Sequence, residues 1–219
     1  MNKKEPHPFF FQKKYVPLQS EHSLTFMQIT DRQVEIIEAA SELLTRSGLG
    51  GLTIKNLAKE MRFSESAIYR HFESKEEIIV TMLHYLDDNM KQRLSLALAV
   101  VVHPEEKLKA LFANQFAFFS EHPHFIVIVL SEGLLENTAL IHAALLKVML
   151  TKKSFVLPIL EEGQQLGLFK DSLSTEFLAH TVMGIFRLFM LQWRISGFQF
   201  DLAEKGNETL ENILTLIKK

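Results

Sequence analysis

The chain of 219 residues contains no cysteine. Disulfide scaffolds, thiolate metal sites and cysteine nucleophiles are therefore excluded. Its longest apolar runs, 96–102 and 125–130, fall far short of the roughly 20 residues that span a bilayer. Lys13 and Lys14 interrupt the N-terminal apolar run before a signal-peptide core can form. We therefore expect no membrane contact, no signal peptide and a cytoplasmic location.

Enzyme signatures are also missing from the sequence. We find no Gly-x-Ser-x-Gly, no phosphate-binding glycine loop and no His-Glu-x-x-His. The pair His122 and His124 is a weak metal candidate, because Pro123 disrupts the helical spacing and no third ligand is evident. We expect no catalytic residues, no cofactor and no metal.

Net charge is small, since 26 acidic residues oppose 24 basic ones for a total of −2. A surface that is basic all over, as a nonspecific nucleic-acid coat requires, is excluded, although a local basic patch is not. The hydrophobic fraction is 47% and includes 18 phenylalanines, which is typical of a globular protein with a large core.

Helical periodicity dominates the chain, and no strand-like alternation or internal repeat is present. The fold class is therefore all-α, with about nine helices. Residues 1–29, with three prolines and no helical period, are expected to form an irregular extension. Thr30 and Gln33 predict a capping box, and Pro158 should kink or end its helix. The predicted helices are 31–48, 54–61, 65–72, 75–103, 104–122, 124–136, 139–165, 174–196 and 201–218.

Two short helices joined by a tight connection, residues 53–72, predict a helix-turn-helix. The segment Leu52–Glu60 followed by Phe63–Ile78 resembles the DNA-binding domain of the TetR family of repressors. The run Tyr-x-His-Phe-x-x-Lys-Glu at 69–76 carries this resemblance most specifically. Between Thr53 and Lys75 five basic residues face three acidic ones, so the segment is locally basic within an acidic chain.

The resemblance implies a DNA-binding domain at 30–90 and a larger helical ligand-binding and dimerisation domain at 91–219. Phosphate contacts position such a domain, whereas contacts with base edges give it sequence specificity. Arg70 or Lys55 could pair with a guanine, and Glu65 could accept from a cytosine. Arg62 stands where the family often has glycine, which suggests an altered turn. The expected DNA-binding residues are Thr53, Lys55, Ser64, Glu65, Ser66, Ala67, Tyr69, Arg70, His71 and Lys75.

Helix 174–196 carries two neighbouring apolar stripes, and a helix that is apolar on two sides needs two partners. We expect one stripe to pack within its own domain and the other to form a homodimer. Such a dimer would place two recognition helices about 34 Å apart on a palindromic operator. The expected interface residues are Ala179, Met183, Phe186, Met190, Trp193, Leu210, Ile213, Leu214 and Ile217.

The family commonly holds an inducer in its second domain, so the resemblance implies a small apolar ligand of unknown identity. A wall rich in Phe and Met suits such a ligand, although a filled core of the same residues is the alternative. Gln115, His142, Gln164 and His180 are polar candidates for orienting it. The expected pocket residues are Phe112, Phe116, Phe119, Phe125, Met149, Phe155 and Phe177.

Two other functions remain open from the sequence. One is a TetR-like factor that organises DNA without an inducer, for which a sealed and filled second domain would argue. The other is a helical small-molecule-binding protein without DNA function, which would show no salt-sensitive, sequence-selective DNA binding.

Overall fold

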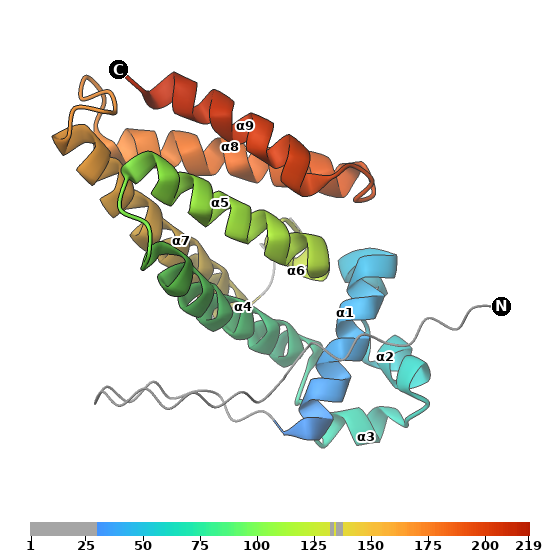
Figure 1. Cartoon of the computed structure of the whole chain (residues 1–219). Helices are drawn as coiled ribbons and strands as arrows, with labels where there is room; N and C mark the ends of the chain where they lie inside the picture. Colours follow the sequence, from blue (N-terminus) through green and yellow to red (C-terminus); the bar gives the residue numbers. More distant parts are fainter. Residues whose placement is uncertain (1–29, 132–133, 135–137) are drawn as a thin grey trace, which may run out of the picture. The chain divides into compact units, whose positions relative to one another are not determined.

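The computed structural model describes residues 30–131, 134 and 138–219, and this part of the chain contains nine α-helices and no strand (Figure 1). The predicted all-α fold is confirmed. The expected N-terminal extension, 1–29, lies outside the described residues. The helices are α1 (Asp31–Gly51), α2 (Ile54–Met61), α3 (Glu65–Tyr69), α4 (Lys75–Leu98), α5 (Pro104–Glu121), α6 (His124–Val129), α7 (Ala139–Gln165), α8 (Thr175–Ile195) and α9 (Leu202–Ile217).

The chain forms two compact units, unit 1 up to Lys75 and unit 2 from Glu76 onward. The sequence-based division at residue 90 assigned the first turns of α4 to the DNA-binding domain. By contacts these turns group with unit 2, and the domain boundary at residue 90 stays a prediction.

Unit 1 is built around α1, whose first turn carries the predicted capping box. The Thr30 hydroxyl accepts from the Gln33 amide N–H, and the Gln33 side chain accepts from the backbone of Thr30. Gly48 has a non-helical backbone, with φ 64° and ψ −170°, so the first helical segment ends there as predicted, and a short second segment continues α1 to Gly51. The buried residues of this unit are Ile36, Ile37, Ala40, Leu43, Leu44, Leu52, Leu57, Ala58, Ile68 and Phe72.

Arg62 terminates α2 in the left-handed conformation, with φ 57° and ψ 40°. Its backbone N–H donates to the carbonyl of Lys59, and the N–H of Phe63 donates to that of Ala58 at 2.8 Å. These two bonds form the Schellman motif that closes many helices, normally with glycine at the left-handed position. The turn therefore keeps the geometry expected for glycine, although arginine occupies it.

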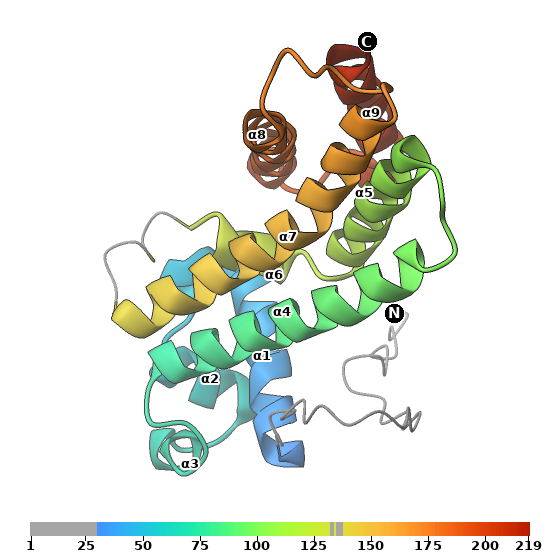
Figure 2. The ribbon, with the colours of Figure 1, turned by 90° about the vertical axis from the view of Figure 1, so that its left-hand side faces the viewer.

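Unit 2 packs its long helices in pairs: α5 contacts α9 and α7, and α8 contacts α7 and α9 (Figure 2). Gly206 lets α9 approach α5 closely, because a Cβ at that position would lie 2.5 Å from the Phe116 ring. Phe116 in turn is within ring-contact distance of Phe186 on α8, with centroids 5.7 Å apart. Aromatic side chains thus form the centre of this unit.

Helix α7 ends at Gln165 as the sequence predicted, whereas α6 ends earlier than predicted. Helix α7 continues past Pro158 to Gln165 and closes at Gly167, whose φ is 71°. Since Pro158 is exposed, the backbone carbonyl that loses its partner lies near solvent. Helix α6 ends at Val129, earlier than the expected residue 136, and part of the remainder lies outside the described residues.

Candidate functional site

The helix-turn-helix begins each of its two helices with a side-chain cap. Thr53 accepts from the N–H of Asn56 at 3.1 Å, and Ser64 accepts from the N–H of Ala67 at 3.2 Å. Ser64 and Ser66 also share a hydrogen bond of 2.9 Å between their hydroxyls. These caps satisfy amide groups that the first turn of a helix leaves unpaired.

All ten residues that the sequence assigned to DNA contact are exposed or half-buried in the structure, and none belongs to the core. Tyr69 is 51% exposed, whereas Ile68 and Phe72 beside it are buried. Tyr69 is therefore not simply a packing residue. One side of the short helix α3 is apolar and buried, and its other side is polar and exposed. The exposed side is therefore available to contact another molecule.

Contacts within unit 1 hold this surface in place. The Gln33 amide donates to the carbonyl of His71 at 3.0 Å, which joins α1 to the end of the motif. Arg46 on α1 pairs with Glu60 on α2 at 2.7 Å, and this hydrogen bond lowers the pKa of Glu60. Lys75 donates to the carbonyl of Leu49. The exposed surface of the helix-turn-helix is thus held to α1 by contacts of Gln33, Arg46 and Leu49.

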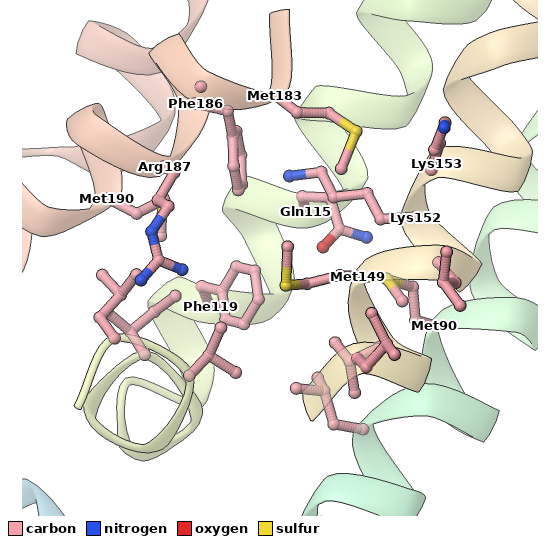
Figure 3. A pocket seen from close by; sticks show the side chains of 18 of the residues that line it. Met90, Gln115, Phe119, Met149, Lys152, Lys153, Met183, Phe186, Arg187 and Met190 are labelled. Atoms are coloured by element: carbon pink, nitrogen blue, oxygen red, sulfur yellow. The ribbon is translucent and has the colours of Figure 1, made fainter. Parts of the chain in front are cut away.

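Unit 2 contains a cavity of about 390 Å³ bounded by helices α4 to α8 (Figure 3). This volume lies in the range of small-molecule sites. Its wall is mainly apolar and includes four methionines, whose flexible side chains adapt to irregular ligands. The lining residues are Leu86, Met90, Gln115, Phe119, Ile126, Val129, Leu130, Leu146, Val148, Met149, Leu150, Lys152, Lys153, Ala179, His180, Met183, Gly184, Phe186, Arg187 and Met190.

The predicted pocket residues are only partly brought together. Phe119 and Met149 line the cavity. The other five do not: Phe112, Phe116 and Phe125 are buried among other rings, and Phe177 is exposed on α8. Phe155 is half-buried and also lies outside the lining. Periodicity shows that a Phe side chain faces the interior, but not whether it packs against another side chain or lines a cavity.

Four residues expected at the dimer interface line the cavity instead: Ala179, Met183, Phe186 and Met190. The remaining five are buried within their own chain, so they are not available to a second copy without rearrangement; they are Trp193, Leu210, Ile213, Leu214 and Ile217. Their burial within the single chain gives no support to this part of the interface assignment.

A third stripe of α8 remains uncovered. Phe177, Leu188 and Ile195 are 56%, 57% and 76% exposed. With Thr181, Gly184 and Leu191 they recur at alternating spacings of four and three residues, which is the period of a helix that packs against another helix. The alternation was visible in the sequence, but it was hidden by the more apolar stripes beside it.

A buried ionic contact joins α4 to α7 outside the lining of the cavity. The carboxylate of Asp87, which is fully buried, lies 2.7 Å from the Lys91 ammonium and 3.3 Å from that of Lys147. Desolvation raises the pKa of Asp87, but hydrogen bonds from Lys91, Thr151 and Lys147 outweigh it, so the pKa is lowered. Asp87 therefore stays ionised and holds the two helices together next to Leu86 and Met90.

Gln115 and Lys152 are polar exceptions in the cavity wall. Of the four polar candidates named from the sequence, Gln115 and His180 line the cavity; Gln164 instead bonds to Lys170 and Thr175. Lys152 was missed, although a signal existed. It follows Val148 and precedes Val156 by four residues each, so it stands on the buried face of α7.

Metal-binding geometry is absent from the described part of the chain, where no group of three or more His, Asp or Glu residues is suitably placed. The ring centroids of His122 and His124 are 5.9 Å apart. Burial lowers the pKa of His124 to about 3, with a smaller contribution from His122. Among the same residues, no helix combines the length and the apolar character needed to cross a membrane.

Two family models match the chain. Residues 36–82 match the N-terminal model described as bacterial regulatory proteins of the tetR family. Residues 104–207 match the model described as the C-terminal domain of tetracyclin repressor-like proteins. The chain belongs to the TetR family. The TetR resemblance and the prediction of a DNA-binding transcriptional regulator are therefore confirmed.

Individual TetR relatives agree with this assignment. The transcriptional repressor NicS of Pseudomonas putida is 27% identical over 63% of this chain and 66% of its own length, just under two thirds. FadR of Bacillus subtilis, solved in complex with stearoyl-CoA, superposes with a TM-score of 0.72 at 20% identity over 84% of this chain and 98% of FadR. KstR2 of Mycobacterium tuberculosis, a ketosteroid transcriptional regulator, gives 0.74 at 21% identity over 88% and 97%. The two structures share the fold.

Proposed function

We propose that this TetR regulator is a homodimeric repressor that binds a palindromic operator and leaves it when a small, mainly apolar ligand enters unit 2. One combination of features carries the proposal: an exposed, locally basic helix-turn-helix in unit 1 and a cavity of about 390 Å³ in unit 2. Its activity is binding rather than catalysis, and its place of action is the bacterial cytoplasm, where operator DNA lies.

The DNA-reading role rests on α2 and α3. Lys55 on α2 and Arg70 at the end of α3 are both exposed, and such side chains form bidentate contacts with guanine in the major groove. Tyr69 and Thr53 offer hydroxyl groups of the kind that contact phosphates. We assign base contacts to the first pair and positioning contacts to the second.

The dimer rests on the uncovered stripe of α8. Phe177, Leu188 and Ile195 are large apolar side chains of α8 that water contacts in the single chain. Large side chains repeating at this spacing pack well against the same helix of a second copy related by a two-fold axis. A two-fold dimer also explains how one short recognition helix per chain achieves useful affinity, because two half-sites are bound together.

The ligand role rests on the cavity itself. A DNA-organising factor without an inducer, the first alternative, would have a filled second unit, whereas this unit has space for a ligand. FadR, which has the same fold, was solved in complex with stearoyl-CoA, and KstR2 is described as a ketosteroid regulator. Both names support a largely apolar ligand, in agreement with the methionine-rich wall.

Helix α4 connects the two functions along the chain. It begins at Lys75, just after the helix-turn-helix, and its residues Leu86 and Met90 line the cavity. A ligand that favours one position of α4 over another therefore changes the affinity for DNA. Couplings of this kind amount to about 1–3 kcal/mol, or a change of roughly 5- to 150-fold in operator affinity.

Fluorescence anisotropy with the DNA upstream of the protein's own gene tests the proposal. We expect binding that is sequence-selective, that weakens steeply with salt, and that an apolar ligand of the cavity reverses. A protein that binds small molecules but shows no selective, salt-sensitive DNA binding would instead support the second alternative, a helical binder without DNA function.

Substitutions separate positioning from specificity. Tyr69→Ala should weaken binding to all sequences alike, whereas Lys55→Ala and Arg70→Ala should relax preference at particular base pairs by about 1–3 kcal/mol. Lys205→Ala on α9, which removes an equal charge outside the motif, is the matched control and should change little. Equal losses on every sequence for all three reading variants would contradict the division of roles.

A further inference from the structure

Among the residues that the structure describes, two polar side chains in the cavity wall lack a hydrogen-bond or ion-pair partner for their donor group. Gln115 on α5 is the first. It is only 1% exposed, and its amide nitrogen has no hydrogen-bond partner in the described part of the chain. A buried amide donor without an acceptor destabilises a protein, so such groups need an explanation. Gln115 lines the cavity, and an acceptor atom on a bound ligand would satisfy it.

Lys152 on α7 is the second. Its ammonium lies 3.0 Å from the centroid of the Phe186 ring (Figure 3). The centroid of the Phe112 ring is 5.6 Å from the same ammonium. Within the described ranges no carboxylate forms an ion pair with it. Its neighbours on the same helix differ, since Lys147 pairs with Asp87 and Lys153 pairs with Glu176 at 2.7 Å.

The environment of Lys152 is unfavourable for its charge. Desolvation by burial lowers its pKa well below the ordinary lysine value. Contacts with aromatic rings compensate a buried ammonium only in part, and an anion close to the ammonium would compensate it far better. Gln115 and Phe112 are three residues apart on α5, which places Gln115 on the side of that helix whose Phe112 ring lies 5.6 Å from the ammonium.

We propose that Gln115 and Lys152 bind the carboxylate of an apolar, chain-like acid whose hydrocarbon part occupies the methionine-lined remainder of the cavity. This assignment rests on the proposed function and narrows its ligand class. A carboxylate matches one cation and one amide donor in charge and in acceptor number. The thioester of an acyl-CoA offers Gln115 an acceptor but carries no charge there for Lys152.

The other basic groups of the cavity are less suited to the charged end of the ligand. Arg187 and His180 are exposed, so water already solvates them, and the Lys153 ammonium is already paired with Glu176. The attraction between two opposite charges is strongest where water is excluded. The carboxylate is therefore directed to Lys152 rather than to the exposed groups.

Isothermal titration calorimetry on the full chain with three probes of equal chain length tests this assignment: dodecanoate, 1-dodecanol and lauroyl-CoA. We expect dodecanoate to bind at least about tenfold more tightly than dodecanol. Lys152→Met should abolish that preference by weakening dodecanoate binding, while dodecanol binding stays within about twofold of wild type. Lys205→Met on α9, an exposed lysine outside the cavity lining, is the matched control and should preserve the preference.

Thermal unfolding of the ligand-free variants provides the folding check. Lys152→Met removes a half-buried ammonium that has no carboxylate partner in the described part of the chain, and should melt at or above the wild-type temperature. Should it fail to fold, Gln115→Met is the second variant, and it should likewise weaken dodecanoate more than dodecanol. Equal affinities of dodecanoate and dodecanol in the wild type, or equal losses of both in Lys152→Met, would overturn the assignment. Tighter binding of lauroyl-CoA that does not depend on Lys152 would also overturn it.

Operator release, measured with the same probes by anisotropy, separates this assignment from the proposed function. If a neutral apolar compound releases the operator and dodecanoate does not bind, the carboxylate assignment fails and the proposed function stands. If dodecanoate binds in a Lys152-dependent manner but neither it nor any other cavity ligand releases DNA, the assignment stands and ligand-controlled repression fails.

Discussion

Replacing Arg62 by glycine should stabilise the protein. Arg62 closes α2 with φ 57° and ψ 40°, a conformation that costs a residue with a Cβ about 1–2 kcal/mol. Glycine removes this strain but gives the unfolded chain more freedom, which costs about 0.4–1 kcal/mol. The difference is a net stabilisation of about 1 kcal/mol, or roughly 2–4 °C in the unfolding midpoint of a chain of this size.

The charge of Arg62 must be separated from its backbone in this experiment. Arg62→Ala removes the same exposed guanidinium but keeps the strain, so it serves as the reference for Arg62→Gly. Asparagine tolerates the left-handed region better than most residues, and Arg62→Asn should therefore fall between the two.

Thermal unfolding followed by far-UV circular dichroism measures the series in the absence of DNA. We expect the order of unfolding midpoints to be glycine, then asparagine, then alanine. An alanine variant as stable as the glycine variant would refute the reasoning, because it would show that the left-handed backbone at this joint carries no strain. DNA affinity should fall equally in the alanine and glycine variants, since both lose the same charge.

Three further outcomes follow from unit 2. Leu188→Asp should weaken the homodimer by at least about 2 kcal/mol, because both copies lose a side chain whose burial stabilises by about 1.5–3 kcal/mol; light scattering at micromolar concentration that still gave only dimer would contradict the α8 interface. Gly206→Val should lower stability by about 1–3 kcal/mol through overpacking against Phe116, whereas Asn207→Val at the neighbouring exposed position should cost less than half as much in urea unfolding. His124, with a pKa of about 3 when folded and about 6.5 when unfolded, binds its proton more readily in the unfolded state, so its contribution to stability is complete above pH 6.5 and is lost as the pH falls toward 3. His124→Gln should flatten the unfolding free energy in that window, and an unchanged slope would show that another group is responsible.

The reading motif was predictable from sequence because its signals are local. Capping residues such as Thr53 and Ser64 act within one helical turn, and the resemblance in residues 69–76 depends on neighbours in the chain. The cavity was less predictable. Phe119 and Phe116 stand on the same helix with the same inward periodicity, yet only Phe119 lines the cavity, because the packing of other helices decides where space remains.

The amino-acid sequence by itself determined the all-α fold, the helix-turn-helix and its basic character, since each depends on periodicity, capping and charge within short segments. Only the tertiary structure decided which large apolar side chains of α8 stay exposed, since α5, α7 and α9 cover the others. It also decided that Gln115 and Lys152, 37 residues apart in the chain, line one cavity. Burial and the absence of a partner are properties of packed helices, and no segment of sequence contains them alone.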